Sequence, residues 1–579
     1  MEISKKYWCS VLVTSIGLLV MTYLFFGAYY ASSATSMLSI AFQPTILNAE
    51  MAEMHLYLNF ISESIFFLNN TFPFFYSYDA ILCLFVVIST IVVTIIALST
   101  FKSKWYYVLP ALSVFYILFW MENVVFLDIT RIAFILSFSA LFLLIWNITN
   151  YNSDTTYYYN IFISCIIFLL GYLVRYEAAI LILSLFLVLI AFKMVISRTS
   201  ILDFLKVLTP VFLIAVVFYP KNDWMTSDKV NDLKLNEIDS YYVNIMNVGY
   251  YENRSNLSAS ELMKIEAIKR EFLADKNQIL DLTFLKNVTN NKLIQFGTLL
   301  NGKLNYQKLH ELKELIVGQY ILYFIIYIAL LIFYIVTFLI TSTNKFDLFL
   351  LLSFNVVIGS LVILITILYK MESRGLFPII QFLFFSNVFL VKDKFRFNFT
   401  YHSILIILLY VVSIISITCN IVRINQRKNE HQENLQNVES VWSEINNRFK
   451  AETVIFGLNS LAELTYSKPF SIPYYLNIQK ASKEVIAYDS HVFLLLSATY
   501  KKKIKNFCGS LSMKDFYEAS YKKRDRIIHI YDAERISFFI KYLKVIHDVE
   551  VDFKRFEGYQ IDRILGDKYY YNLQKFKQH

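Results

Sequence analysis

The stretch "GYLVRYEAAIL" at residues 171–181 places two charged side chains, Arg175 and Glu177, inside an otherwise apolar run over residues 158–196. A run of about 18 or more apolar residues has the length of a bilayer-spanning helix, because each backbone amide in hydrocarbon must be bonded within its own helix. The run is long enough for two such helices, with the charged pair at the turn between them. This stretch therefore predicts a membrane protein with paired charges at helix ends.

Composition supports the same class of protein. The chain has 579 residues, of which 57% are hydrophobic and 17% are aromatic, and its mean hydropathy is +0.49. That apolar content exceeds what an ordinary soluble protein carries. The net charge of +9 is spread over predicted cytoplasmic loops and the C-terminal tail, so we attribute it to membrane topology and lipid headgroups and expect no nucleic-acid partner.

Apolar runs of this kind recur over the first three quarters of the chain. The eleven candidate spans lie near residues 7–30, 79–100, 106–120, 132–148, 158–174, 178–196, 204–219, 319–341, 346–369, 376–391 and 402–422. Basic residues in short loops stay on the cytoplasmic side during insertion. Lys and Arg gather in the loops that are cytoplasmic if the N-terminus is inside, so an odd number of spans predicts an extracytoplasmic C-terminus.

Two long polar segments then lie on the outer side. One covers residues 220–317 and contains a helical pattern, "SASELMKIEAIKREFLAD", that opens on a Ser/Glu capping box. The other covers residues 423–579 and alternates helical and strand patterns: "ENLQNVESVWSEINNRF", "TVIFGLNS", "IIHIYD", "AERISFFIKYLKVI" and "VEVDF". That order predicts a small α/β domain.

The predicted fold is thus an α-helical polytopic membrane protein with a C-terminal extracytoplasmic α/β domain. We assign residues 1–422 to the transmembrane helical domain, with outer loops at residues 31–78 and 220–317. Residues 423–579 form the extracytoplasmic domain.

Four basic residues depart from the inside bias, and each stands close to an acid at a predicted outer helix end. The three groups are Asp128 with Arg131 in "FLDITR", Arg175 with Glu177 in "VRYE", and Lys370, Glu372 and Arg374 in "YKMESRGLFP". A charge at membrane depth is costly unless it is paired or faces water, so such residues mark a candidate cavity. Arginine suits phosphate because its planar fork donates two parallel hydrogen bonds. The alternative is that these groups are interfacial salt bridges that tie helix ends together.

The layout resembles the GT-C superfamily of polyprenyl-phosphate-sugar-dependent membrane glycosyltransferases. The shared features are a first span, a long outer loop, a dense helical bundle and a C-terminal outer domain. The local resemblances are "MHLYLNFISESIFFLNNTFPFFYSYDAIL", "ITRIAFILSFSALFLL", "GYLVRYEAAIL" and "ESRGLFPIIQF". The last is similar to an Arg followed by a Leu-x-Pro helix start that lies near the lipid phosphate in such enzymes.

The resemblance implies transfer of a sugar from a polyprenyl-phosphate-linked donor to a glycan, lipid or protein of the cell envelope, at the outer face of a bacterial inner membrane. It implies cationic groups that bind the donor phosphate, and a divalent metal, Mg²⁺ or Mn²⁺, would fit that chemistry. The residues that match this role are Arg131, Arg175, Lys370 and Arg374.

The family pattern places a catalytic acid soon after the first span, and here the chain departs from it. Residues 31–43 read "ASSATSMLSIAFQ", and the first acids are Glu50 and Glu53 in "NAEMAEMH". Three positions apart, they would share one face of a helix, and His55 lies near that face. We take Glu50 and Glu53 as candidate bases. The candidate cavity-lining residues are His55, Asp79, Asp128, Glu177 and Glu372.

Other functions stay open. A polysaccharide polymerase or ligase also has many spans and outward-facing arginines, although such proteins usually end soon after a span. A catalytically inactive scaffold with this fold would explain the missing early acid. A transporter ranks lower, because transporters tend to show internal duplication and helices broken near the bilayer midplane.

Overall fold

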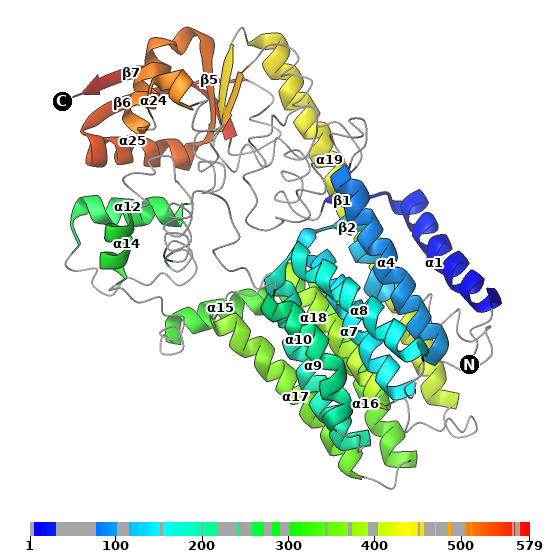
Figure 1. Cartoon of the computed structure of the whole chain (residues 1–579). Coiled ribbons are helices and arrows are strands. Elements are labelled where there is room, and N and C mark those ends of the chain that lie inside the picture. Colours follow the sequence, from blue (N-terminus) through cyan, green and yellow to red (C-terminus); the bar gives the residue numbers. More distant parts are fainter. Residues whose placement is uncertain are drawn as a thin grey trace.

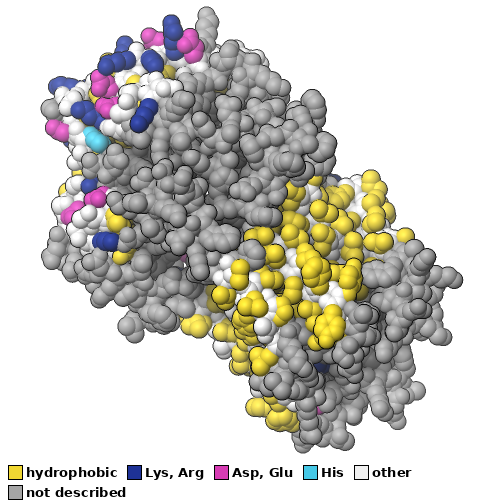
Figure 2. Space-filling view, in the orientation of Figure 1, with side chains coloured by type: hydrophobic (Ala, Val, Ile, Leu, Met, Phe, Trp, Pro, Cys, Tyr) yellow, Lys and Arg dark blue, Asp and Glu magenta, His cyan; other side chains and the backbone are white. Residues whose placement is uncertain are grey.

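Apolar helices form the larger part of the described residues, and a mixed sheet lies toward the C-terminal end of the chain (Figure 1). Where side chains are described, those visible on the helical part are mostly hydrophobic, whereas charged side chains gather over the sheet and the helices beside it (Figure 2). This division is the one expected when one part of a chain faces lipid and another faces water.

The structure is a computed structural model, and it describes the chain in segments. These are residues 5–30, 77–100, 115–150, 155–197, 201–217, 257–270, 281–289, 302–341, 345–368, 373–391, 403–449, 452–456, 484–487, 504–510, 512–558 and 568–578, with single positions between them.

Among these residues, six helices are long and apolar enough to cross a membrane, which makes the chain a multi-pass helical membrane protein. They involve α4 (Ser77–Thr100), α7 (Ile129–Asn150), α8 (Thr155–Val174), α9 (Tyr176–Ser197), α16 (Ile321–Thr341) and α17 (Lys345–Leu368). Further apolar helices are α1 (Lys5–Phe26), the π-helix η3 (Tyr116–Trp120) with α6 (Met121–Val125), α10 (Ile201–Val217), α18 (Ser373–Val391) and the first half of α19 (Ser403–Arg448). The count of eleven spans stays a prediction.

Helix α7 is the centre of the bundle. Its span Ile129–Asn147 is buried along its whole length, and it packs on α4, α8, α9 and α18. Its sequence, "ITRIAFILSFSALFLLIWNITN", is apolar on every side. A helix of that kind has no face for water and is stable only when it is surrounded.

The first and third expected spans differ from the structure at their C-terminal ends. Helix α1 stops at Phe26 because Gly27 adopts a positive φ of 75°. The chain then forms strand β1 (Tyr29–Tyr30), which pairs in parallel with β2 (Phe126–Leu127). Most of the third expected span lies outside the described residues, and its helix continues to Val125 instead of ending at residue 120.

Two helices are longer than their apolar patterns. Helix α19 has 46 residues and runs without a break across the predicted boundary at 422 and 423, so the expected helix at 433–449 is its last part. Helix α15 (Gly302–Leu315) continues through the π-helix η7 (Ile316–Tyr320) into α16. In both cases a polar helix extends an apolar one, and a hydropathy pattern marks only the apolar part.

The C-terminal part contains a five-stranded sheet in the order β4-β3-β5-β7-β6. Its strands are β3 (Thr453–Phe456), β4 (Glu484–Ala487), β5 (Ile527–Asp532), β6 (Val549–Arg555) and β7 (Lys568–Gln578). The first three are parallel, and β7 is antiparallel to both β5 and β6. Helices α24 (Met513–Lys522) and α25 (Ala533–His547) accompany them, and Asp532 caps α25 by accepting from Arg535 N over 2.6 Å. The sequence patterns anticipated β3, β5, α25 and β6, but not β4, β7 or α24.

Helices from the long loop at 220–317 share a hydrophobic core with this sheet. They are α12 (Ala259–Lys269), whose Ser258/Glu261 capping box is confirmed, and α14 (Leu282–Val288). The Arg270 guanidinium reaches Glu534 of α25 over 2.6 Å. Helices α12 and α14 of this loop therefore pack on the C-terminal part, whereas α15, at the end of the loop, packs on α17 of the membrane part.

The central strand β5 carries a buried histidine. His529 is 1% exposed, and neither ring nitrogen has a hydrogen-bond partner among the described residues. Its ring stacks between Tyr517 and Tyr531, with centroids 6.0 Å from each. Burial lowers the pKa of His529 from 6.5 to about 3.

We predict that acid weakens the sheet through His529. The unfolded chain binds a proton below pH 6.5 and the folded sheet does not, so stability falls as the pH drops from 6.5 toward 3. At pH 5 the loss is about 2 kcal/mol, or about 30-fold in the opening equilibrium. The opening equilibrium at each pH is measured by hydrogen exchange of peptides that cover residues 527–532, after correction for the pH dependence of the intrinsic exchange rates. The variant His529→Phe should lose most of this pH dependence, and an unchanged dependence would contradict the assignment.

Candidate functional site

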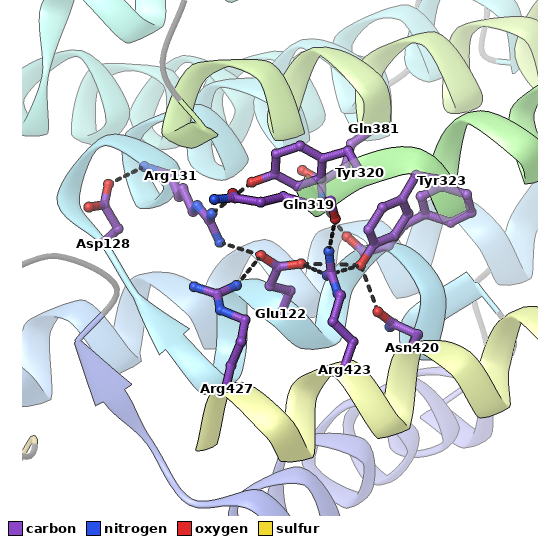
Figure 3. A network of polar contacts seen from close by, with 11 residues as sticks. Glu122, Asp128, Arg131, Gln319, Tyr320, Tyr323, Gln381, Asn420, Arg423 and Arg427 are labelled. Carbon is purple, nitrogen blue, oxygen red and sulfur yellow. Dashed lines mark hydrogen bonds and ion pairs between the residues drawn. The ribbon is translucent and has the colours of Figure 1, made fainter. Parts of the chain in front are cut away.

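Glu122 lies at the centre of a buried charge network where several helix ends meet (Figure 3). It belongs to α6, between η3 and β2, and is 1% exposed. Arg131, Arg423 and Arg427 form ion pairs with its carboxylate. We call these four residues the Glu122 cluster.

Arg131 enters the cluster from the first turn of α7. Its Nη1 donates to Glu122 Oε1 over 3.0 Å, and its Nη2 donates to the Tyr320 hydroxyl over 3.3 Å. Asp128 caps the helix by accepting from Thr130 N at 2.9 Å and from Arg131 N at 3.2 Å. The Arg131 guanidinium forms its ion pair with Glu122, and the Asp128 carboxylate caps the helix while its charge also acts on Arg131.

Arg423 and Arg427 come from successive turns of α19. The Arg427 Nη1 donates to Glu122 Oε1 over 2.8 Å, and the Arg423 Nη2 donates to Glu122 Oε2. Arg423 also donates to the backbone carbonyl of Gln319. The Tyr323 hydroxyl lies 3.1 Å from Glu122 Oε2 and 2.8 Å from Asn420 Oδ1, so it donates to one of them. Helices α6, α7, α16 and α19 are thereby joined through one carboxylate.

The charges in the cluster do not balance. Three guanidinium groups face one carboxylate, which leaves an excess of two positive charges (3 − 1), and counting Asp128 reduces it to one. The Nε atoms of Arg131 and Arg423 are buried and have no hydrogen-bond acceptor among the described residues. Buried donors normally have partners. The cluster can therefore accommodate more negative charge than Glu122 supplies.

The arginine side chains of α19 are more exposed than the one of α7. The side chain of Arg131 is 3% exposed, that of Arg423 is 19% exposed and that of Arg427 is 28% exposed. Beyond Arg427, His431 stacks on Tyr29 of β1 with centroids 5.6 Å apart. Burial and the nearby Arg427 charge lower the pKa of His431 to about 4, so this ring is neutral at pH 7. Any anion would approach the cluster from the α19 side, where the guanidinium groups are accessible.

Two of the predicted phosphate-binding residues lie close together. Arg175, at the turn between α8 and α9, donates to the Thr130 hydroxyl, one residue from Arg131. Its Nε lies 3.7 Å from Glu177 Oε2, and the two side chains are 26% and 43% exposed. Both Arg131 and Arg175 thus lie at the N-terminus of α7, although each has an acidic neighbour.

Asp79 is also buried near this end of the bundle. It is 2% exposed, stands in the first turn of α4, and accepts a hydrogen bond from the Tyr30 hydroxyl. Tyr30 belongs to β1, which pairs with the segment that joins α6 to α7. Asp79 therefore fixes the N-terminal end of α4 to the strand pair beside the cluster.

The remaining predicted site residues lie outside the described part of the chain. They are Glu50, Glu53, His55, Lys370 and Glu372, together with the side chain of Arg374. Within the described residues, no group of three or more His, Cys, Asp or Glu side chains could hold a metal ion. Their placement and the metal both stay predictions.

Sequence reasoning missed Glu122, Arg423 and Arg427. Glu122 stands alone in the apolar sequence "FWMENVVFL", and the two arginines are four positions apart directly after the last apolar run. Side chains four apart on a helix lie on one face, so the Arg423 and Arg427 spacing was the available signal. No spacing rule connects them to Glu122, which lies about 300 positions earlier.

Comparison with known proteins gives no further guide. No family model, curated protein or solved structure matches the chain.

Proposed function

We propose that the chain is a membrane glycosyltransferase of the GT-C type. It transfers a sugar from a polyprenyl-phosphate-linked donor to a cell-envelope acceptor at the outer face of a bacterial inner membrane. The observation that carries the proposal is the excess positive charge of the Glu122 cluster, beside which Arg175 adds a further guanidinium. Such a cluster matches a phosphate leaving group.

The arrangement of helix ends supports the proposed topology. With the N-terminus inside and eleven spans, the outer ends include the C-terminus of α1, the N-termini of α4, α7 and α16, and the middle of α19. These are the ends that hydrogen bonds and strand pairs bring together around Glu122. In this topology the C-terminal α/β domain is extracytoplasmic.

The proposed reaction breaks the bond between the sugar C1 and the phosphate oxygen. A bond from the acceptor oxygen to C1 forms, a carboxylate takes the acceptor hydroxyl proton, and polyprenyl phosphate leaves with one additional negative charge. Positive groups that act on that developing charge lower the barrier. Glu122 is unsuited as the base, because ion pairs with three guanidinium groups engage its carboxylate. Glu50 and Glu53 remain the proposed bases.

A second candidate is an inactive scaffold in which the same network only clamps α6, α7, α16 and α19 together. The ion pairs of Glu122 with all three arginines favour it, because each guanidinium already has an anionic partner. On this alternative, removal of a partly exposed arginine changes stability and not ligand binding.

Arg427→Ala should weaken binding of undecaprenyl phosphate to the chain in nanodiscs by about tenfold, because a charge-assisted hydrogen bond is lost. Arg448→Ala is the matched control: it lies on the same helix, is 58% exposed and pairs with Glu444. Native mass spectrometry measures binding, and release of undecaprenyl phosphate from its sugar-linked form in envelope membranes measures transfer. Equal binding by both variants, or no release by the wild-type chain, would reject the transferase in favour of the scaffold.

A further inference from the structure

A ridge of side chains four residues apart runs along α19. It consists of Val411, Ile415, Cys419, Arg423 and Arg427. Residues at this spacing are neighbours on a helix surface and form one inclined ridge. Val411 and Ile415 are 49% and 56% exposed, and Cys419 is an exposed free thiol. The ridge is therefore apolar and accessible along the membrane part of the helix.

The outer end of the same ridge is cationic. Arg423 and Arg427 keep part of their surface exposed while their Nη atoms bond to the buried Glu122. Next to Arg423 lies the exposed Gln319, whose carbonyl accepts from Arg423 Nη1 at the seam where α19 meets α16. An apolar track that ends in two guanidinium groups matches an amphiphile with one long chain and an anionic head.

The π-helix η7 lies at the level of the cluster, where its residues contact Arg131 and Arg423. It covers Ile316–Tyr320, and the added residue in its turn helps to aim Tyr320 at Arg131 while Val317 stays 51% exposed. Such single-turn π-helices are frequent at functional sites. Exposed side chains continue the apolar surface along α16 at Ile321, Ile325 and Ile328.

We infer that polyprenyl phosphate binds from the side, with its isoprenoid chain along the α19 ridge and its phosphate on Arg427 and Arg423. This inference rests on the proposed function and adds the route of the carrier lipid. The charge of the cluster favours this lipid over a phospholipid. A phosphate monoester carries about −1.5 to −2 charges at neutral pH and a phospholipid diester carries one, so the net positive cluster attracts the monoester more strongly, whether its excess is counted as two or, with Asp128, as one.

Cys419 provides a native reporter, because it stands on the ridge one turn before Arg423. The full chain in phosphatidylcholine nanodiscs is treated with N-ethylmaleimide, and peptide mass spectrometry follows the alkylation rate of each cysteine. Undecaprenyl phosphate should slow alkylation of Cys419 at least fivefold. Cys165 of α8, a half-buried free thiol away from the ridge, is the internal control and should keep its rate.

The lipid controls decide the outcome. Two lipids serve as controls at equal mole fraction: undecaprenol, which has no phosphate, and phosphatidylglycerol. With either one, the alkylation rate of Cys419 should stay within twofold of its rate in phosphatidylcholine alone. Arg427→Gln should reduce the protection by undecaprenyl phosphate. If the lipid binds but Cys419 is not protected, or phosphatidylglycerol protects it equally, this route is wrong and the transferase proposal stands. If undecaprenyl phosphate does not bind at all, both fail.

Discussion

Glu122→Gln should largely abolish the folded chain, because it leaves three guanidinium groups without their shared carboxylate. The substitution keeps the shape of the side chain and removes its charge at a position that is 1% exposed. The new amide NH₂ would also face guanidinium donors where an oxygen now accepts from them. Removing one partner of a buried ion pair costs about 3–5 kcal/mol. That is a large share of typical domain stability, about 5–15 kcal/mol.

The expected readout is a loss of monodisperse protein after detergent extraction and a lower unfolding temperature of what remains. Glu177→Gln is the matched control, because it makes the same chemical change at a carboxylate that is 43% exposed and 3.7 Å from its arginine. Exposed pairs of that kind contribute about 0–1 kcal/mol. Normal folding of Glu122→Gln would show that the guanidinium groups are neutralised by other groups.

A double variant separates charge from shape. Compared with Glu122→Gln alone, the double variant Glu122→Gln with Arg423→Gln has one positive charge fewer in the cluster. It should therefore recover part of the stability that the single variant loses. Residues in one network are coupled, so the double variant should be more stable than the sum of the two single effects predicts. Additive losses would argue that repulsion among the guanidinium groups is not the cause.

Local patterns predicted the elements of this fold better than its site. Apolar run length located the described long helices, since a bilayer fixes the length of a spanning helix. The Ser258/Glu261 capping box was readable from sequence because the cap acts within three positions. The path of the chain beyond a helix end was not readable where it depends on another segment. After α1 ends before Gly27, for example, the next residues are held by the pairing of Tyr29 with Phe126.

The site was predicted only in part for the same reason. Arg131 and Arg175 were recognised because each is an exception to a charge rule that is local in sequence. Their meeting point depends on Glu122 and on α19, and nothing in the sequence links residues 122 and 423 before the bundle assembles. The acids near Arg131 and Arg175 in sequence suggested local pairs. In the first of these, Asp128 caps the helix, and the guanidinium of Arg131 also reaches the distant Glu122.

Gly171→Ala should separate α8 from α7 and move Arg175. A Cβ on Gly171 would lie 2.5 Å from Ser137 Oγ, 3.0 Å from Ser137 N and 3.1 Å from Ala133 O, all on α7. The hydroxyl can rotate away, but the two backbone atoms belong to the fully buried central helix and cannot. Such overpacking costs about 1–3 kcal/mol.

This clash is also coupled to the site. Gly171 O accepts from Arg175 N over 3.1 Å, so the displaced turn carries the guanidinium that bonds to Thr130. We expect Gly171→Ala to lower the unfolding temperature and to weaken undecaprenyl phosphate binding together. Gly359→Ala on α17 is the matched control: nothing lies within 4 Å of the added Cβ, so the change should be neutral or stabilising by up to about 1 kcal/mol. Equal unfolding temperatures and equal lipid binding of the two variants would mean that α8 does not lie as close to α7 at Gly171 as the structure shows. A loss of stability with unchanged lipid binding would separate Arg175 from the phosphate site.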